Sequence, residues 1–190
     1  MTALMRLFFL LLLSVVAATV ARGADFRVRL GSEDMLEGGR IEKMTVITSN
    51  RQFNIFPPKN WSRQVNDASQ KIIFTSPSGK SAVTVWFSAN SPGQLPLPDQ
   101  LRDQALQAHP GAGISPPLVC PTSFQPGVFF DLVRLPAPNV VQKIRHAFVP
   151  GPLGVEEFVL TSSGDEFDRN RLVFMAIARS FRVEPPKARP

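Results

Sequence analysis

The sequence has 190 residues, of which 44% are hydrophobic and only 19% are charged, and its formal net charge is +6. This apolar content favours a folded core over a wholly disordered chain. A single Cys excludes an intrachain disulfide framework, a Cys-based zinc site and an iron-sulfur cluster, and two His residues disfavour a His-rich metal site. We therefore expect no metal or other cofactor.

The N-terminal segment has the features of a secretory signal. Arg6 precedes an unbroken apolar run at residues 7–13, and the small residues Ala21 and Gly23 suit cleavage after Gly23. The run is shorter than the roughly 20 residues that a membrane-spanning helix needs. We predict a signal peptide at residues 1–23, an exported protein in the periplasm or outside the cell, and no stable membrane span after cleavage. An uncleaved N-terminal anchor is the alternative.

The first half of the mature chain predicts strands after a polar start. Residues 24–40 contain three glycines and show no sustained periodicity, so we interpret them as a linker or loose lead-in. From Ile41 onward, alternating apolar residues predict two strands, around Met44 and around Phe53. Two β-branched and aromatic runs, 72–75 and 82–87, flank a Ser-Pro-Ser-Gly turn and predict a hairpin.

The second half predicts a helix, a meander of strands and a closing helix. Pro98 suits the first turn of a helix that ends at His109, and residues 111–127 form a long connection rich in Pro, Gly and Ser. Three strands follow, at 128–135, 140–149 and 155–161, separated by turns that contain proline. Ser163 or Asp165 is expected to cap the last helix, and residues 184–190 form a tail.

Two groups of strands, each followed by a helix, predict an α+β fold. We expect a single domain at residues 41–183, built as one mostly antiparallel sheet with helices packed on its faces.

Two stretches of the sequence contain motifs of a known kind of domain. The first contains Phe53, Ile55, Pro58 and Trp61, followed by a strand, a Ser-Pro-Ser-Gly turn and the strand that begins at Ala82. The second is the closing helix, whose matching residues are Phe167, Arg171, Phe174, Ile177, Ser180 and Phe181. Both stretches resemble the PsbP/Mog1-like domain family, and the resemblance covers about residues 41–183. It implies an α/β/α sandwich in a secreted, bacterial-type member, and mostly non-enzymatic roles as assembly factors or accessory subunits.

A search for catalytic motifs finds none. The sequence contains no Gly-x-Ser-x-Gly nucleophile elbow and no glycine-rich loop with a Lys placed to hold phosphate. Cys120 is more typical of a small buried apolar residue than of a nucleophile. We interpret His109 as a surface residue that ends a helix. No catalytic residue is predicted.

Two polar groups in the meander are candidate sites. If Leu135 pairs with Val140, the side chains of Arg134, Lys143 and Arg145 share one face of the hairpin and form a weak basic surface for an anionic partner. A solvated face without a partner is the alternative.

Pairing of Val149 with Gly154 would place Glu157 opposite His146, with Asp131 on the diagonal. Such a group could be a general acid-base pair or half of a metal site, and cross-strand charge pairing is the simpler interpretation.

The sequence thus favours an exported, non-enzymatic binding or accessory module of the cell envelope. Its partner would be a protein or an anionic envelope component. The scattered basic residues do not predict nucleic-acid binding. The alternative is an envelope hydrolase or other enzyme whose site is assembled from residues distant in sequence.

Overall fold

The computed structural model describes residues 26–36, 38–48, 51–87, 95–123, 125–151 and 154–184. The predicted signal peptide and residues 185–190 of the predicted tail lie outside these ranges. None of the helices within them is both long and apolar enough to cross a membrane.

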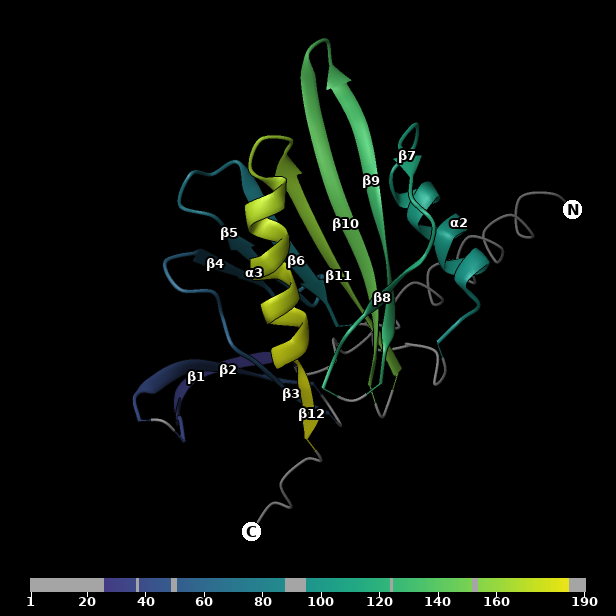
Figure 1. Ribbon diagram of the computed structural model, residues 1–190. Coiled ribbons are helices and arrows are strands. Elements are labelled where there is room, and N and C mark those ends of the chain that lie inside the picture. Colours follow the sequence, from purple (N-terminus) through teal and green to yellow (C-terminus); the bar gives the residue numbers. More distant parts are fainter. Residues whose placement is uncertain are drawn as a thin grey trace, which may run out of the picture.

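The described strands form two sheets in which every pair is antiparallel (Figure 1). The smaller sheet has the order β1 (Arg27–Asp34), β2 (Arg40–Ile47), β3 (Gln52–Ile55), β12 (Arg182–Glu184). The larger sheet has the order β4 (Ser62–Asn66), β5 (Lys71–Thr75), β6 (Ser81–Trp86), β11 (Gly154–Ser163), β10 (Val140–Gly151), β9 (Gly127–Ala137), β7 (Gly113–Ile114), and β8 (Leu118–Cys120) also pairs with β9.

Two helices, α2 (Pro98–Ala108) and α3 (Phe167–Ser180), complete the described elements. The structure confirms the α+β class, the hairpin of β5 and β6, and the antiparallel meander of β9, β10 and β11. The expectation of one sheet is wrong, because β2 and β3 pair with β1 and β12 in a sheet of their own.

The interpretation of residues 24–40 as a loose lead-in is also wrong for the part that the structure describes. Residues 27–34 form β1, which pairs with β2 along its whole length, and Phe26 is buried in the core. At the other end, the predicted tail residue Glu184 belongs to β12, where its carboxylate accepts a hydrogen bond from Gln52. These polar strands carry few apolar residues, so periodicity does not reveal them.

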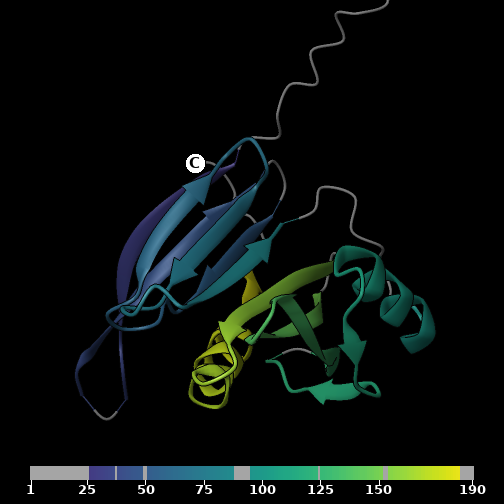
Figure 2. The same cartoon turned by 90° about the horizontal axis from the view of Figure 1, so that it is seen from above.

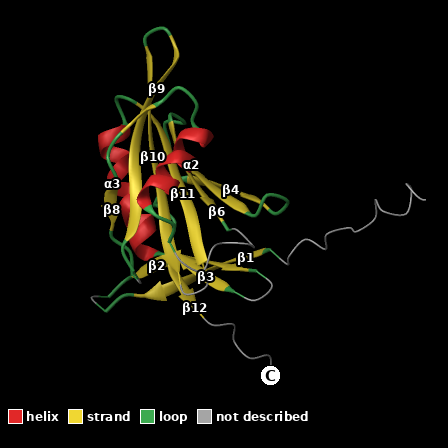
Figure 3. Cartoon of the chain, turned by 90° about the vertical axis from the view of Figure 1, so that its right-hand side faces the viewer, coloured by secondary structure: helices red, strands yellow, loops and turns green. Residues whose placement is uncertain are grey.

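Apolar side chains gather in two clusters that lie on opposite faces of the larger sheet, because neighbouring residues of a strand point to opposite sides. Phe174 and Ile177 of α3 belong to the larger cluster, which also contains Met44, Val46 and Phe53 of the smaller sheet. Figure 2 shows α3 (yellow) beside β10 and β11 of the larger sheet. Leu101 and Ala105 of α2 belong to the other cluster. The long strands of the larger sheet therefore run between the two helices (Figure 3).

The start of α3 differs from the prediction. The helix begins at Phe167, and neither Ser163 nor Asp165 caps it, because Glu166 occupies the capping position. Glu166 makes no side-chain capping bond, and its carbonyl accepts the hydrogen bond from the amide of Asn170. The turn before α3 directly follows β11. The side chain of Glu166 accepts a hydrogen bond from Ser81 of the larger sheet, as described below.

Candidate functional site

The three basic residues predicted to share one face of the β9–β10 hairpin do not do so. Arg134 lies opposite Gln142, whereas Lys143 lies opposite Val133. Because side chains alternate along a strand, Lys143 and Arg145 point to one face of the sheet and Arg134 points to the other. The structure therefore does not form the predicted basic cluster.

The turn of the hairpin explains this error. The sequence prediction paired Leu135 with Val140 across a four-residue turn, but Ala137 pairs with Val140 and only Pro138 and Asn139 form the turn. Asn139 takes the left-handed conformation that such a turn requires, with φ of 64°. A bulge between Val140 and residue 142 then leaves the register one residue away from the predicted one, which turns each side chain to the other face.

Arg145 serves the fold. Its guanidinium donates two hydrogen bonds to the carboxylate of Asp131, which lies directly opposite, at 2.7 and 2.8 Å. It also lies over the ring of Phe129, 4.0 Å from the centroid, and only 5% of the residue is exposed. A buried cation that is held in this way offers nothing to a partner at the surface.

The predicted polar group of Asp131, His146 and Glu157 is divided between the two faces of the sheet. Asp131 is directed to the face of Arg145, whereas His146 points to the face of α2. The predicted pairing of Glu157 directly opposite His146 is wrong, because His146 lies opposite Val159, but the two side chains still meet, with Nε2 of His146 3.2 Å from the carboxylate. Glu157 lies opposite Phe148 and reaches His146 diagonally, because a register error of two residues keeps the same face.

A second histidine, His109, meets this pair from the end of α2. Its ring lies edge-on to that of His146, with 5.6 Å between the centroids, and the ring of His146 stacks on Phe148 at 4.6 Å. Gln104, on the same helix, donates a hydrogen bond to the carboxylate of Glu157. The expectation that His109 ends the helix is confirmed, but the residue is half-buried rather than a surface residue.

The surroundings of His109 lower its pKa and so favour its neutral form. Burial lowers the pKa of His109 below its usual 6.5, and the nearby His146 and Arg134 lower it further. In the described part of the chain, Nε2 of His109 and Nδ1 of His146 are buried without hydrogen-bond partners. The described residues contain no group of three or more His, Cys, Asp or Glu side chains that could hold a metal ion.

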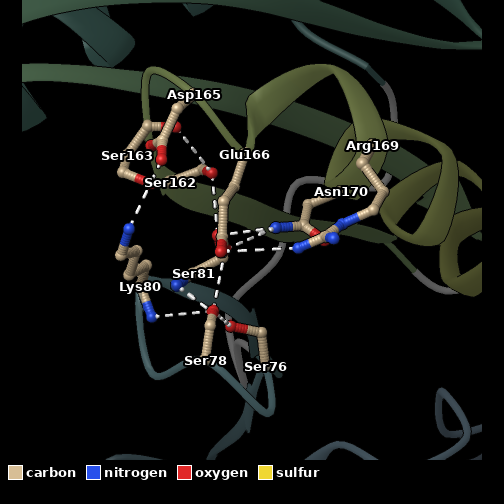
Figure 4. Close-up of polar contacts among 10 residues, drawn as sticks. All are labelled: Ser76, Ser78, Lys80, Ser81, Ser162, Ser163, Asp165, Glu166, Arg169 and Asn170. Carbon is tan, nitrogen blue, oxygen red and sulfur yellow. Dashed lines mark hydrogen bonds and ion pairs between the residues drawn. The ribbon is translucent and has the colours of Figure 1, made fainter.

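A polar cluster that the sequence analysis missed fastens the start of α3 to the larger sheet (Figure 4). The carboxylate of Glu166 accepts hydrogen bonds from Ser78 at 2.8 Å and Ser81 at 3.2 Å. Ser81 also contacts Ser162 at 2.8 Å and accepts a bond from Asn170 at 2.7 Å. The five residues come from two distant regions of the sequence, 78–81 and 162–170, so no local motif predicts the cluster. Their mutual hydrogen bonds indicate a structural role.

Cys120, at the end of β8, is buried. Burial raises the pKa of its thiol to about 11, although Arg145 and Arg179 oppose the shift. A thiol with such a pKa is protonated at neutral pH and is a poor nucleophile. The expectation that Cys120 packs as a small apolar residue is confirmed.

The β9–β10 hairpin extends beyond its neighbours in the sheet (Figure 1). Pairing with β7 ends at Val133, and pairing with β11 begins only at Gln142. Residues 134–141 therefore form a two-stranded ribbon, which we call the hairpin tip. Its exposed aliphatic residues are Leu135, Val140 and Val141, and the adjoining Val133 is exposed as well. Exposed apolar side chains gathered in this way indicate a binding surface.

An open hollow of about 480 Å³ lies at the base of the hairpin tip. It is lined by Val140, Val141 and Lys143 of the hairpin and by Ser163, Gly164 and Asp165 of the turn before α3, together with Asn139. Asp165 is ion-paired with Lys80 at 3.3 Å.

Comparison with known proteins gives similarity to solved structures but no match to a family model or a curated sequence. Among solved structures, the solution structure of cyanobacterial PsbP (CyanoP) from Synechocystis sp. PCC 6803 is similar, with a TM-score of 0.48 and 13% sequence identity. The similarity covers 88% of this chain and 97% of that chain.

Proposed function

We propose that this chain is an exported, non-catalytic binding or accessory module of the cell envelope. Its fold would be the α/β/α sandwich of the PsbP/Mog1-like domains, and its domain would include β1 and β12 in addition to the predicted range 41–183. Its partner is a protein or an anionic envelope component. The site is the hairpin tip, residues 134–141, in place of the three basic residues that the sequence analysis selected.

The exposed aliphatic surface of the hairpin tip carries this proposal. Leu135 is 70% exposed at the tip, on a ribbon that no other strand of the described residues flanks. Burial of an exposed leucine side chain is favourable by about 1.5–3 kcal/mol, so contact of Leu135 with a partner would stabilise the complex by an amount of this order. Single exposed apolar residues are ordinary, but a projecting group of them marks an interaction site.

The ionisable side chains of the meander support a binding role over a catalytic one. Arg145 is held by Asp131, and His146 is held by Glu157. Both pairs lie beside buried rings and link neighbouring strands. Cross-strand pairs of this kind stabilise sheets.

Co-sedimentation of the protein with envelope fractions of its host tests the proposal. The fraction of protein that sediments should fall strongly in the variant Leu135→Ser/Val140→Ser, because the variant lacks the apolar contact. Leu172→Ser is the matched control, since Leu172 on α3 is 66% exposed but lies away from the hairpin tip, and it should bind like the unaltered protein. Equal sedimentation of all three proteins would refute the hairpin tip as the binding site.

The alternative is an envelope hydrolase or other enzyme. One observation favours it: within the described structure, each ring of the pair His109 and His146 has a buried nitrogen without a hydrogen-bond partner. The discriminating variant is His146→Gln. A module needs no activity from this residue, so the variant should bind envelope fractions normally. An enzyme would lose a measured activity in the variant while its thermal midpoint stayed unchanged.

A further inference from the structure

The hairpin tip combines an apolar end with a cationic base. Arg134 and Lys143 lie at its base on opposite faces of the ribbon, as the register of β9 and β10 requires. Beyond them come Leu135, Pro136, Ala137, Pro138, Asn139, Val140 and Val141, none of which is charged. The sequence contains no Asp or Glu at all between Asp131 and Glu156.

We propose that the hairpin tip inserts into an anionic lipid surface. This inference rests on the proposed binding function and names the partner. The apolar end would enter the boundary between headgroups and acyl chains, and Arg134 and Lys143 would meet the phosphate groups on either side of the ribbon.

The dimensions of the ribbon fit this role. Pro138 is four residues beyond Arg134, which corresponds to about 13 Å at about 3.4 Å per residue. Apolar faces of interfacial elements are buried about 5–10 Å into the membrane boundary. The apolar end can therefore be buried while the two cations stay at the level of the headgroups.

The composition of the tip favours lipid over a protein partner. Energetic hot spots of protein interfaces are enriched in Trp, Tyr and Arg, whereas Leu and Val are under-represented there. The end of this tip is aliphatic and contains no aromatic residue. A tip of eight residues is also small beside the 20–30 residues that each side of a standard protein interface contributes, which counts against pairing of two copies through it.

The charges around the tip do not oppose binding of an anionic surface. Asp131 is bound by Arg145, and Asp165, which lines the hollow at the base, is ion-paired with Lys80. The whole sequence has a net charge of +6, and removal of residues 1–23, which contain Arg6 and Arg22 and no acidic residue, leaves +4. Long-range attraction to anionic lipid would therefore bring the protein to the surface before the apolar end enters it.

Binding to lipid vesicles tests the inference with the protein in the form that its host produces. It should sediment with vesicles that contain phosphatidylglycerol and much less with pure phosphatidylcholine, and binding should weaken as salt is added. Arg134→Gln/Lys143→Gln should weaken binding about 30-fold, since each cation near such a surface contributes about fivefold. Leu135→Ser should weaken it about tenfold or more, and Leu172→Ser should not change it.

A fluorescent label reports insertion directly. Leu135→Cys accepts an environment-sensitive dye, because the native Cys120 is buried, and its emission should shift to the blue on anionic vesicles. The same dye at Leu172→Cys should show no shift. A shift at neither position, or an equal shift at both, would overturn the inference.

The outcomes separate this inference from the proposed function. One outcome is that the hairpin-tip variants no longer sediment with envelope fractions and the unaltered protein does not bind vesicles. The partner is then a protein, so the lipid inference is wrong although the binding function stands. If neither envelope fractions nor vesicles bind, both are wrong. Concentration-dependent dimerisation that Leu135→Ser abolishes would assign the tip to a second copy and would also overturn the lipid inference.

Discussion

Arg145 lies in the larger sheet with its guanidinium between the carboxylate of Asp131 and the ring of Phe129. The carboxylate is needed at this depth, because its removal would leave the charge of Arg145 buried and uncompensated. Lys143 lies on the same face of the sheet as Arg145, whereas Arg134 lies on the other face, and both are at the base of the hairpin tip.

His109 gives the stability of the protein a dependence on pH. Its pKa is lowered in the folded state, so the unfolded chain binds a proton more readily. This contribution to stability is complete above about pH 6.5 and decreases as the pH falls below that value toward the folded pKa. We predict a lower urea midpoint at about pH 5 than at about pH 7.5 and a smaller difference in His109→Gln. Identical pH dependence in the two proteins would contradict this assignment.

A contact between site residues could be predicted only where the error in strand register was an even number of residues, because such an error keeps each side chain on its face of the sheet. The contact of His146 with Glu157 survived because the error was two residues, which preserves the face. The grouping of Arg134 with Lys143 and Arg145 failed because the error was one residue. Nothing local signalled that His109 would reach His146, since that contact depends on where α2 packs.

Among the elements, α3 is the one whose burial the sequence predicted most directly. Phe174 is fully buried in the larger core cluster, whereas Leu172, two residues earlier, is 66% exposed. We predict that Phe174→Ala lowers the free energy of unfolding by about 3–5 kcal/mol, because it leaves a cavity. Leu172→Ala should change it by less than about 0.5 kcal/mol. Denaturant titration of both variants measures the difference, and a similar effect of the two would contradict the assigned helix face.

The strands divide by composition into those that sequence patterns reveal and those that they miss. The β5–β6 hairpin is β-branched and alternates, and its strands were predicted within a residue or two. β4 has the sequence Ser-Arg-Gln-Val-Asn and is exposed throughout, so it lacks an apolar face. β1 and β12 are similar cases at the edges of the smaller sheet. Edge strands of this kind form because a partner strand is available. The sequence of the segment itself therefore does not reveal them.

The whole molecule has a core shared by two sheets and a helix, and this arrangement was beyond local patterns. Arg51, just before β3, is ion-paired at 3.1 Å with Glu156 of β11, and both are buried. The two sheets are thus linked by residues 105 positions apart. The periodicity of the sequence specifies which residues are buried but does not specify which distant segments bury them.

The projecting hairpin tip gives the molecule one apolar end outside this core (Figure 1). Its length follows from a chain that continues eight residues beyond the last neighbours in the sheet, at Val133 and Gln142. The proposed function requires that this end be covered in the cell.

Site-specific photo-crosslinking in the native host tests this central claim most directly. A photoreactive amino acid at Leu135 should give crosslinks to an envelope component, lipid or protein, because the hairpin tip is covered there. The same group at Leu172, which is exposed to nearly the same extent, should give none of these products. Crosslinks of equal yield at both positions, or none at Leu135, would contradict the claim that the hairpin tip is the binding site.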